Sequence, residues 1–253
     1  MTLKLIDLLL PKFCFGCCRP GAFLCSSCQN EILYTKIPLC PICERPSPYG
    51  LTHPRCKKKL SIDGLFVLGD YRGILKKMLL GFKYKNVFSV SEILCQLANT
   101  RLPSPYFRVD IITSVPLHTN RLKERGYNQS EILAVNIAKN KNIGFSNNVL
   151  VRNRYTLPQM TLKSNKERVK NIKGAFSVVN REIIKSRSIA LVDDIVTTGA
   201  TIFETAKVLK RKGAGCVYGV VMARKIPSRY LWSKLLLHIF DTHPSFFVFF
   251  KFY

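Results

Sequence analysis

Acidic residues are scarce in this chain. Its 253 residues include 15 Asp and Glu against 40 Lys and Arg, which leaves a formal net charge of +25. An excess of this size most often accompanies a polyanionic partner or an anionic membrane surface. A merely solvated basic surface is the alternative, so the charge favours a class of partner without specifying a function.

Long apolar runs are missing too. No uninterrupted run approaches the ~18 residues that a membrane-spanning helix needs. The opening MTLKLIDLLLPKFC contains a short apolar run, but Cys14 follows at once and no small-residue cleavage site marks an export signal. We therefore expect a cytoplasmic protein without a transmembrane segment, for which peripheral association with the inner face of the membrane stays open.

Two common nucleotide-binding motifs are also absent. The chain has no GxxxxGK[ST] sequence, which excludes a P-loop. GAGCVY at 213–218 begins like a dinucleotide fingerprint, but Tyr218 stands where the third glycine belongs, and the stretch precedes a predicted strand. Any nucleotide or sugar-phosphate site must therefore use another design.

Hydrophobic periodicity predicts alternating helices and strands after residue 60. Helical spacing marks 73–84, 89–99, 130–141 (with Ser130 as a plausible N-cap) and 201–212, which ends at Gly213; short apolar runs mark strands at 110–116, 174–179, 188–195 and 216–223. This alternation predicts an α/β fold with a mostly parallel sheet flanked by helices. We expect that domain at 61–225, a small module at 1–60 and an aromatic extension of unknown role at 226–253.

Cysteine is concentrated near the N-terminus. Eight of the ten cysteines lie within the first 56 residues, and seven of them, with His53, form the pattern C14-x2-C17, C25-x2-C28, C40-x2-C43 and H53-x2-C56. Each pair offers two ligands at the right separation for tetrahedral Zn²⁺, and a reducing compartment favours metal over disulfides. Sequential pairing predicts two structural zinc sites, although Cys18 could compete with Cys17. The two sets are Cys14, Cys17, Cys25 and Cys28, and Cys40, Cys43, His53 and Cys56.

The stretch ALVDDIVTTGAT at 190–201 predicts an anion site. A buried strand delivers Asp193 and Asp194 to its end, and the loop beyond them is rich in amides and threonine hydroxyls that can surround a phosphate. Gly199 permits the unusual dihedrals that such a loop needs. Carboxylates that accept from vicinal hydroxyls, beside donors to phosphate, describe a ribose 5-phosphate site.

This stretch resembles the phosphoribosyl pyrophosphate (PRPP) signature of type I phosphoribosyltransferases. VPLHTNRLKERGYNQSEILA (115–134) and R-x-R-x-T-x2-Q-x2-L…ER-x2-N-x2-GAF (152–176) are similar to the ComF family of competence proteins, also called ComFC, as are the zinc ribbons. The resemblance covers roughly residues 5–225 and leaves the tail outside. It implies a type I phosphoribosyltransferase fold with zinc ribbons in place of the base-recognising hood, with His53 where a cysteine is usual.

The resemblance also implies roles for two loops. It assigns PRPP binding to Asp193, Asp194, Thr197, Thr198, Gly199, Ala200 and Thr201, and to a pyrophosphate loop of Val115, Pro116, Leu117 and His118. Arg121, Lys123 and Arg125 lie where such enzymes carry a flexible loop that closes over pyrophosphate. Mg²⁺ would accompany PRPP. No catalytic residue can be assigned.

Basic segments supply candidate contacts to nucleic acid or pyrophosphate. They are Arg121, Lys123, Arg125, Tyr127, Arg152, Arg154, Lys163, Lys166, Arg168, Lys170 and Lys173. Long basic side chains on mobile loops suit a phosphate backbone, and Tyr127 or Tyr155 could stack a base. ComF-like proteins are associated with uptake of single-stranded DNA in natural transformation, alongside a membrane channel and a DNA translocase.

We therefore expect a single-stranded DNA-binding competence protein that retains a PRPP site. A working phosphoribosyltransferase acting on an unidentified acceptor is the alternative. A scaffold that docks to the uptake machinery through its zinc ribbons or its tail is compatible with both.

Overall fold

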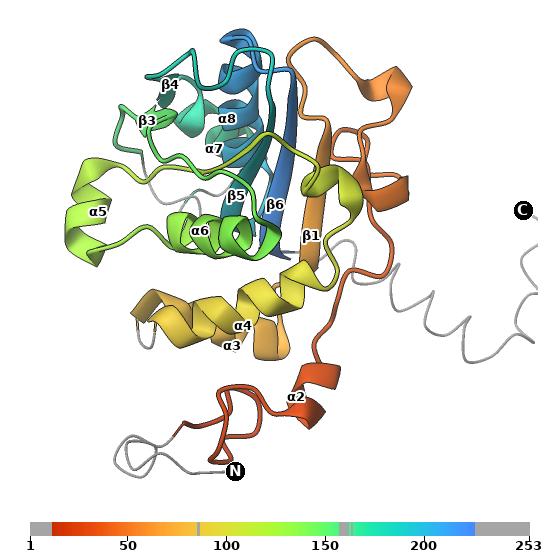
Figure 1. Cartoon of the computed structure of the whole chain (residues 1–253), viewed down its shortest axis with the longest axis vertical. Coiled ribbons are helices and arrows are strands. Elements are labelled where there is room, and N and C mark those ends of the chain that lie inside the picture. The colour runs from red at the N-terminus through yellow and green to blue at the C-terminus, as the bar shows by residue number, and fades with distance from the viewer. Residues whose placement is uncertain (1–11, 85–86, 157–161, 163, 226–253) are drawn as a thin grey trace, which may run out of the picture.

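Strands and helices alternate along the chain from Gly64 onward (Figure 1). The computed structural model describes residues 12–84, 87–156, 162 and 164–225. Its elements are α2 Ser26–Asn30, β1 Gly64–Asp70, α3 Gly73–Tyr84, α4 Val87–Asn99, β2 Ile111–Ser114, α5 Thr119–Arg125, α6 Gln129–Lys141, β3 Leu150–Arg152, α7 Asn165–Ile172, β4 Phe176–Val178, β5 Ser188–Val196, α8 Ala200–Arg211 and β6 Cys216–Arg224, with short 3-10 turns at Pro48–Gly50, Pro54–Cys56 and Ser104–Tyr106.

The main sheet is parallel and has the strand order β1-β6-β5-β2. The two central strands are runs of Val, Ile, Leu and Ala that are buried on both faces, as parallel strands between helical layers require. The predicted type of fold, a parallel sheet flanked by helices, is confirmed. Near its carboxyl end β5 carries both Asp193 and Asp194, which therefore lie at one edge of the sheet.

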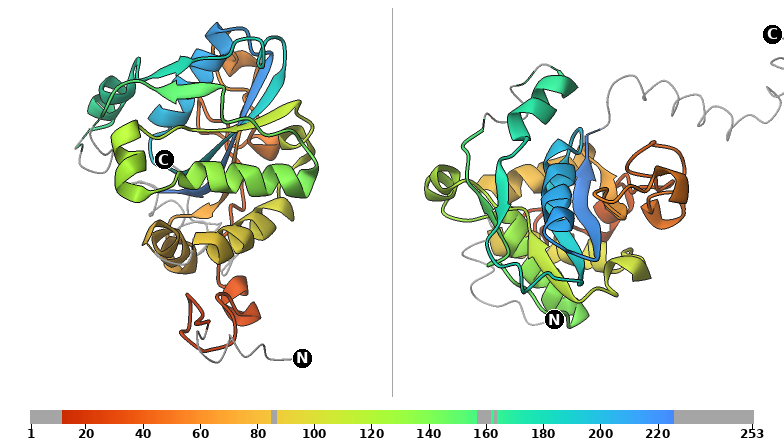
Figure 2. Two further views of the ribbon diagram at one scale, coloured as in Figure 1. Left: turned by 60° about the vertical axis from the view of Figure 1, so that its left-hand side comes forward. Right: turned by 90° about the horizontal axis from the view of Figure 1, so that it is seen from above.

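Successive side chains of β5 enter opposite hydrophobic layers, as the two-residue repeat of a strand dictates. Ala190 and Val192 pack with residues of α3, α4 and α6, whereas Ile189 and Leu191 pack with residues of α8, α7 and the β3–β4 ribbon. Figure 2 shows the sheet between these layers. The ribbon is a separate antiparallel pair, so the predicted strand at 174–179 lies outside the main sheet.

Two basic segments that we expected to be loops are helices. His118 caps α5 by accepting from the Asn120 amide at Nδ1, over 3.3 Å. Ser164 and Glu167 form a reciprocal capping box that starts α7. The expected N-cap of α6 was wrong, because Asn128 occupies that position and its side chain accepts from the Ser130 amide. Hydrogen-bonded caps therefore help to stabilise α5 and α7, although both have few apolar residues.

The two cysteine-bearing segments contact the larger domain at separate places (Figure 1). The first packs on α3, where Gly81 leaves room for the ring of Phe15 and Lys77 Nζ donates to the Gly16 carbonyl over 3.2 Å. The second lies beside β1, bridged from Leu51 to Gly64. The boundary that we placed between residues 60 and 61 stays a prediction.

None of the helices in the described part of the chain combines the length and apolar character needed to cross a membrane. Lys163 and the aromatic stretch 226–253, both singled out above, lie outside the described residues.

Candidate functional site

A cleft of about 360 Å³ opens at the carboxyl ends of the parallel strands. Ligands bind at this edge in open α/β sheets, because the strands end there and the following loops diverge. The lining residues come from the ends of four strands and from α5, α6, β3 and α8. They are Tyr71, Val115, Pro116, Leu117, Arg121, Arg125, Gln129, Ser130, Arg152, Asp193, Asp194, Ile195, Val196, Thr197, Gly199, Ala200, Thr201, Ile202 and Lys225.

One end of the cleft is the loop that leads into α8. Gly199 is the N-cap residue, with a left-handed backbone (φ 80°, ψ −3°) and no side-chain cap. A Cβ there would lie 2.3 Å from the ring of Phe203, so glycine is required both by the dihedral and by the close approach. The amides and dipole of the helix start favour an anion at this end.

The acid pair forms the wall beside that loop. Asp193 Oδ1 accepts from the Ser130 hydroxyl over 2.8 Å and from the Asp194 amide over 2.9 Å. Asp194 Oδ1 accepts from the Ile195 amide over 2.7 Å. These bonds fix the orientation of both half-buried carboxylates, as recognition of paired sugar hydroxyls would require.

Three arginines also line the cleft. Arg121 Nη2 donates to the Thr156 carbonyl over 2.9 Å, Arg125 Nη1 donates to Gln129 Oε1 over 2.5 Å, and Arg152 Nη2 donates to the Thr156 hydroxyl. Burial, helped by the neighbouring Arg121 charge, lowers the pKa of Arg152 to about 10, although Asp193 opposes the shift. Arg152 is still cationic at neutral pH, and a bound anion would relieve the repulsion among these groups.

The other predicted PRPP residues divide between the cleft and its surroundings. Val115, Pro116 and Leu117 line the cleft, whereas His118 caps α5 and packs edge-on against Tyr155, with the ring centroids 5.3 Å apart. The Thr198 hydroxyl accepts from the Ala200 amide over 3.3 Å and is not part of the lining.

The two tyrosines proposed for stacking differ in exposure. Tyr127 is half-buried and donates its hydroxyl to the Phe82 carbonyl over 2.7 Å, which holds its ring against α3. Tyr155 is 48% exposed and has Arg121 and His118 beside it. Tyr155 is therefore the better placed of the two to stack on a base.

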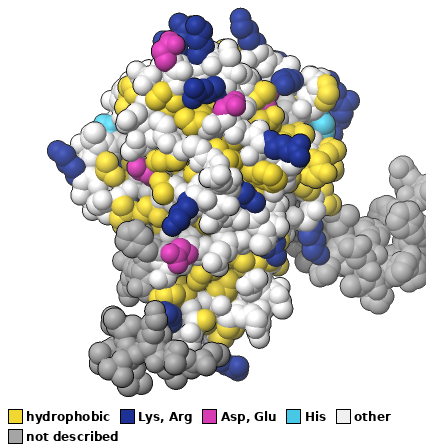
Figure 3. Space-filling model, in the orientation of Figure 1, with side chains coloured by type: hydrophobic (Ala, Val, Ile, Leu, Met, Phe, Trp, Pro, Cys, Tyr) yellow, Lys and Arg dark blue, Asp and Glu magenta, His cyan; other side chains and the backbone are white. Residues whose placement is uncertain are grey.

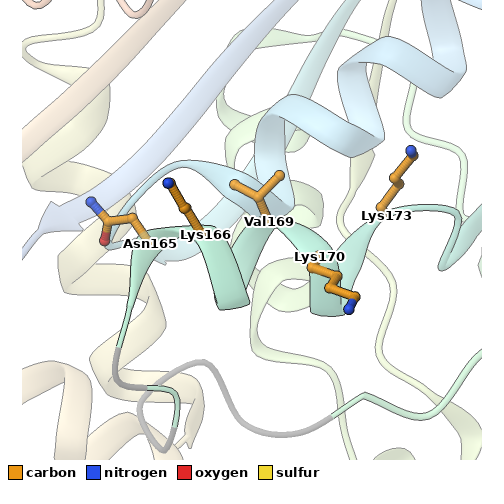
Figure 4. A pocket seen from close by; sticks show the side chains of 5 residues that line it. All are labelled: Asn165, Lys166, Val169, Lys170 and Lys173. Atoms are coloured by element: carbon orange, nitrogen blue, oxygen red, sulfur yellow. The ribbon is translucent and has the colours of Figure 1, made fainter.

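A second basic surface lies on α7. Lys166, Val169, Lys170 and the C-cap residue Lys173, together with Asn165, line a shallow groove that shares no residue with the cleft (Figure 4). The three lysines are exposed, as is Lys123 on α5. Figure 3 shows that Lys and Arg outnumber acids on the face it presents.

Two of the predicted basic contacts instead support the backbone. Arg154 Nη2 donates to the carbonyls of Asn171 and Lys173, over 2.9 and 2.8 Å. Arg168 Nη2 donates to the Leu162 carbonyl over 3.1 Å. Both side chains thus brace the ends of α7.

Several cleft residues were not predicted from the sequence. They are Tyr71, Gln129, Ser130, Ile195, Val196, Ile202 and Lys225. Tyr71 and Lys225 follow β1 and β6 directly, so the rule that ligands bind beyond the carboxyl ends of parallel strands could have found them. Gln129 and Ser130 carry no local signal, because their position depends on how α6 meets β5.

The cysteines form the two clusters that the spacing predicts. Within each, the four candidate ligand atoms lie within 4.8 Å of one another, and Cys18 belongs to neither. His53 Nδ1 faces Cys43 Sγ at 3.3 Å, and its Nε2 lies 3.0 Å from the Pro46 carbonyl oxygen, which suits a metal-binding imidazole held by an outer hydrogen bond.

The thiol chemistry of the clusters fits zinc. The Arg45 amide lowers the pKa of Cys43 to about 6, whereas burial raises the pKa of Cys28 to about 12. Such unequal thiols become uniformly anionic when a metal ion binds them. Three or four sulfur ligands and no open position match structural Zn²⁺, so both clusters could hold it.

A parallel sheet ending in an acid pair and a phosphate-type loop defines a phosphoribosyltransferase-type domain, and the family described as "Phosphoribosyl transferase domain" matches residues 132–252. The chain is 33% identical to Competence protein F of Haemophilus influenzae over 75% of this chain and 85% of that protein. The chain belongs to the ComF family. The domain match runs past residue 225, where we had placed the end of the resemblance.

Other relatives and solved structures are similar. DNA utilization protein YhgH of Escherichia coli is 30% identical over 83% of this chain and 96% of that protein; Competence protein ComFC of Bacillus subtilis is 24% identical over 77% and 81%. The structure of B. subtilis glutamine PRPP amidotransferase with ADP and GMP aligns with 58% of this chain and 30% of its own, at 18% identity and a TM-score of 0.40. That score is too low to add to the fold assignment.

Proposed function

We propose that this protein binds single-stranded DNA during natural transformation and carries a site for PRPP or a ribose 5-phosphate. The names of its relatives, Competence protein F and DNA utilization protein, support the biological role. The exposed lysines of α7 supply a surface for a phosphate backbone, since flexible ammonium groups bind polyanions without reading sequence.

One observation carries the ligand assignment: the acid pair, the start of α8 and three arginines line the same cleft. The Thr197–Thr201 loop would hold the 5-phosphate, and Asp193 with Asp194 would accept from the ribose hydroxyls. Arg121, Arg125 and Arg152 would face the pyrophosphate. Each group meets the chemistry that it can recognise.

Calorimetric titration with PRPP and Mg²⁺, and separately with ribose 5-phosphate, tests the cleft. We expect saturable binding that Asp194→Asn weakens, because the change removes the negative charge and replaces one acceptor oxygen with an NH₂ donor. Asp110→Asn is the matched control, since Asp110 is an exposed acid just before β2 that accepts from Ser188, the first residue of β5, at the opposite end of that strand from the acid pair. Absence of any binding by the unmodified protein would refute the assignment.

Fluorescence anisotropy with a labelled single-stranded oligonucleotide tests the nucleic-acid function. Affinity should fall steeply between about 50 and 200 mM salt, because bound lysines release condensed counterions. Binding that is absent at low salt, or that does not respond to salt, contradicts the proposal.

A working Mg²⁺-dependent phosphoribosyltransferase is the second candidate. The position of Val115, Pro116 and Leu117 in the cleft favours it, because this loop would hold the leaving group. A nucleophile would attack ribose C1 while the bond to pyrophosphate breaks, and pyrophosphate would leave with the electron pair. Phosphorus NMR of PRPP with the protein, Mg²⁺ and a pooled metabolite extract tests this, and binding without pyrophosphate release would exclude turnover of those acceptors.

The zinc ions would be structural. Metal analysis of the purified protein should find zinc at about two ions per chain if both four-ligand clusters fill, and chelation should lower the melting temperature. Protein that is folded and free of zinc would overturn this assignment.

The protein would also meet the DNA-uptake machinery, such as a translocase, with peripheral association at the inner face of the membrane. Co-purification with the translocase, before and after removal of residues 226–253, tests this part and the role of the tail. Loss of association only in the truncated chain would favour the scaffold interpretation.

A further inference from the structure

Gln129, the first residue of α6, has a buried donor that lacks an acceptor. The residue is 2% exposed and lines the cleft. Within the described part of the chain, its side-chain amide nitrogen has no hydrogen-bond partner. A buried donor left unpaired is destabilising, and most buried polar groups are paired, so an unpaired one in a ligand cleft is informative.

The orientation of this amide is settled by its neighbour. Arg125 Nη1 donates to Gln129 Oε1 over 2.5 Å, and a guanidinium has no acceptor. Rotating the amide by a half-turn would place its NH₂ group against another donor. The oxygen therefore faces Arg125, and the NH₂ group faces away from it.

The surroundings indicate which acceptor the NH₂ group meets. Arg152, which also lines the cleft, has a buried nitrogen, Nε, without a partner in the described chain. Arg121, Arg125, Gln129 and Arg152 all line the cleft, so several donors, two of them buried and without a partner in the described chain, belong to one site. A phosphate or pyrophosphate group has enough anionic oxygens to satisfy several donors at once.

We infer that Gln129 is a ligand-binding residue that donates from its side-chain amide to an oxygen of the ligand's pyrophosphate group, while Arg125 holds the amide in place. This inference rests on the proposed PRPP site and assigns one more contact within it. The proposed place of the 5-phosphate is the start of α8, so a contact between Gln129 and the pyrophosphate group would distinguish PRPP from ribose 5-phosphate.

The test compares two variants with two ligands. Gln129→Glu keeps an oxygen for Arg125 but replaces the donor with a negative charge, and Gln129→Met keeps the size and removes both polar groups. Calorimetry should show PRPP–Mg²⁺ affinity reduced about tenfold or more in both, since a hydrogen bond to a charged group contributes about 1.5–3 kcal/mol. Affinity for ribose 5-phosphate should change less than twofold. The same changes at Gln96, an exposed glutamine of α4, are the matched control.

The outcomes separate this inference from the proposed function. If the unmodified protein binds PRPP and both Gln129 variants bind it equally well, the inference is wrong and the site stands. Equal losses for PRPP and ribose 5-phosphate would show a purely structural role and also overturn it. If the unmodified protein binds neither ligand, both proposals fall. Melting temperatures identify any variant that fails to fold. If one Gln129 variant fails, the other is titrated with inorganic pyrophosphate as well, and unchanged affinity for pyrophosphate would overturn the inference.

Discussion

The cleft and the α7 groove are both basic, but they present different chemistry. In the cleft, Arg121, Arg125 and Arg152 are half-buried and hydrogen-bonded, and they share the cleft with an acid pair. On α7, Lys166, Lys170 and Lys173 are exposed ammonium groups along one short helix. A fixed planar guanidinium suits one defined phosphate group, whereas a mobile ammonium group suits many.

This difference separates two kinds of binding that net charge alone cannot distinguish. The cleft has the features of a selective site for a small phosphorylated sugar, with acceptors and donors in fixed positions. The groove has those of a surface for a phosphate backbone, for which geometry matters less than charge and salt. If the comparison is right, variants of one region should leave the function of the other intact.

The largest effect is expected for a residue outside both regions. Asp63 is buried, forms ion pairs with Lys210 over 2.6 Å and with Lys57 over 2.8 Å, and accepts from the Val217 amide over 2.8 Å. Asp63→Asn should reduce the free energy of unfolding by about 3–5 kcal/mol, because it leaves buried positive charge unpaired. Urea unfolding measures this, and Asp110→Asn should cost far less. If Asp63→Asn reduced the free energy of unfolding only slightly, this variant could not serve as the reference for a folding defect without a binding defect.

The same carboxylate predicts a pH dependence. Burial raises the pKa of Asp63, but Lys210 and Lys57 more than offset that, so its pKa is lowered overall. The stability that it contributes is fully present above its unfolded pKa of about 3.9 and is lost as the pH falls through its folded value. Below about pH 4, the free energies of unfolding of the unmodified protein and of Asp63→Asn should therefore become more similar, and urea unfolding at several pH values measures this.

Gly199→Ala should separate the two regions most sharply. The added methyl group meets Phe203 and disfavours the left-handed backbone, so the loop loses the position from which its amides bind phosphate. We expect PRPP affinity to fall about 10- to 100-fold, as one or two charge-assisted hydrogen bonds are lost, with DNA affinity unchanged. Gly213→Ala is the control, because Gly213 also has positive φ but no neighbour within 4 Å of an added Cβ. Equal losses in both variants would point to backbone strain alone.

A triple replacement on α7 tests the other region. Changing Lys166, Lys170 and Lys173 to Gln should weaken single-stranded DNA binding about tenfold and reduce the salt slope by about 2, at roughly 0.7 per phosphate contact. PRPP binding should not change. Anisotropy over a salt series measures the slope, and the exposed lysines Lys76, Lys139 and Lys185 provide a control triple of equal charge. Equal slopes for the two triples would mean that charge, and not the α7 surface, drives binding.

The smallest effect is expected for Ser130→Ala. The Ser130 hydroxyl donates to Asp193 Oδ1 over 2.8 Å and orients that carboxylate. Its loss should reduce the affinities for ribose 5-phosphate and for PRPP equally, by about fivefold, which corresponds to about 1 kcal/mol. Calorimetry measures both ligands. Ser91→Ala, which removes a buried serine that accepts from Asn136 on another part of the fold, should have no effect on affinity.

Much of the sheet and its helices could be predicted because the information is local. The helix at 73–84 has the expected bounds, and the elements at 188–195, 201–212 and 216–223 differ by one residue at one or both ends. Periodicity of apolar residues sets these spans. The grouping of eight ligands into two clusters was predictable for the same reason, since each CxxC pair is a local knuckle.

The rest depends on contacts between distant residues. Helix α7 has a strongly polar sequence and begins at a capping box, and its end is braced by Arg154 from a segment 17 residues earlier. The hydroxyl of Ser130 meets Asp193, 63 residues away, so no local pattern could assign it to the cleft. The separate placement of the two cysteine clusters also depends on a distant contact. Tyr34, in the segment between the clusters, forms a β-bridge with Gly69 of β1.

The pairing of β1 with β6 has a consequence for synthesis of the protein. Asp63, which immediately precedes β1, accepts from an amide 154 residues later in the chain. At about 5–20 residues per second, a ribosome needs roughly 8–30 s to supply that partner strand. During this interval the nascent chain exposes an unpaired apolar strand, while the residues of both cysteine clusters have already been synthesised and can capture metal. Order of emergence therefore favours metal capture first and closure of the sheet last.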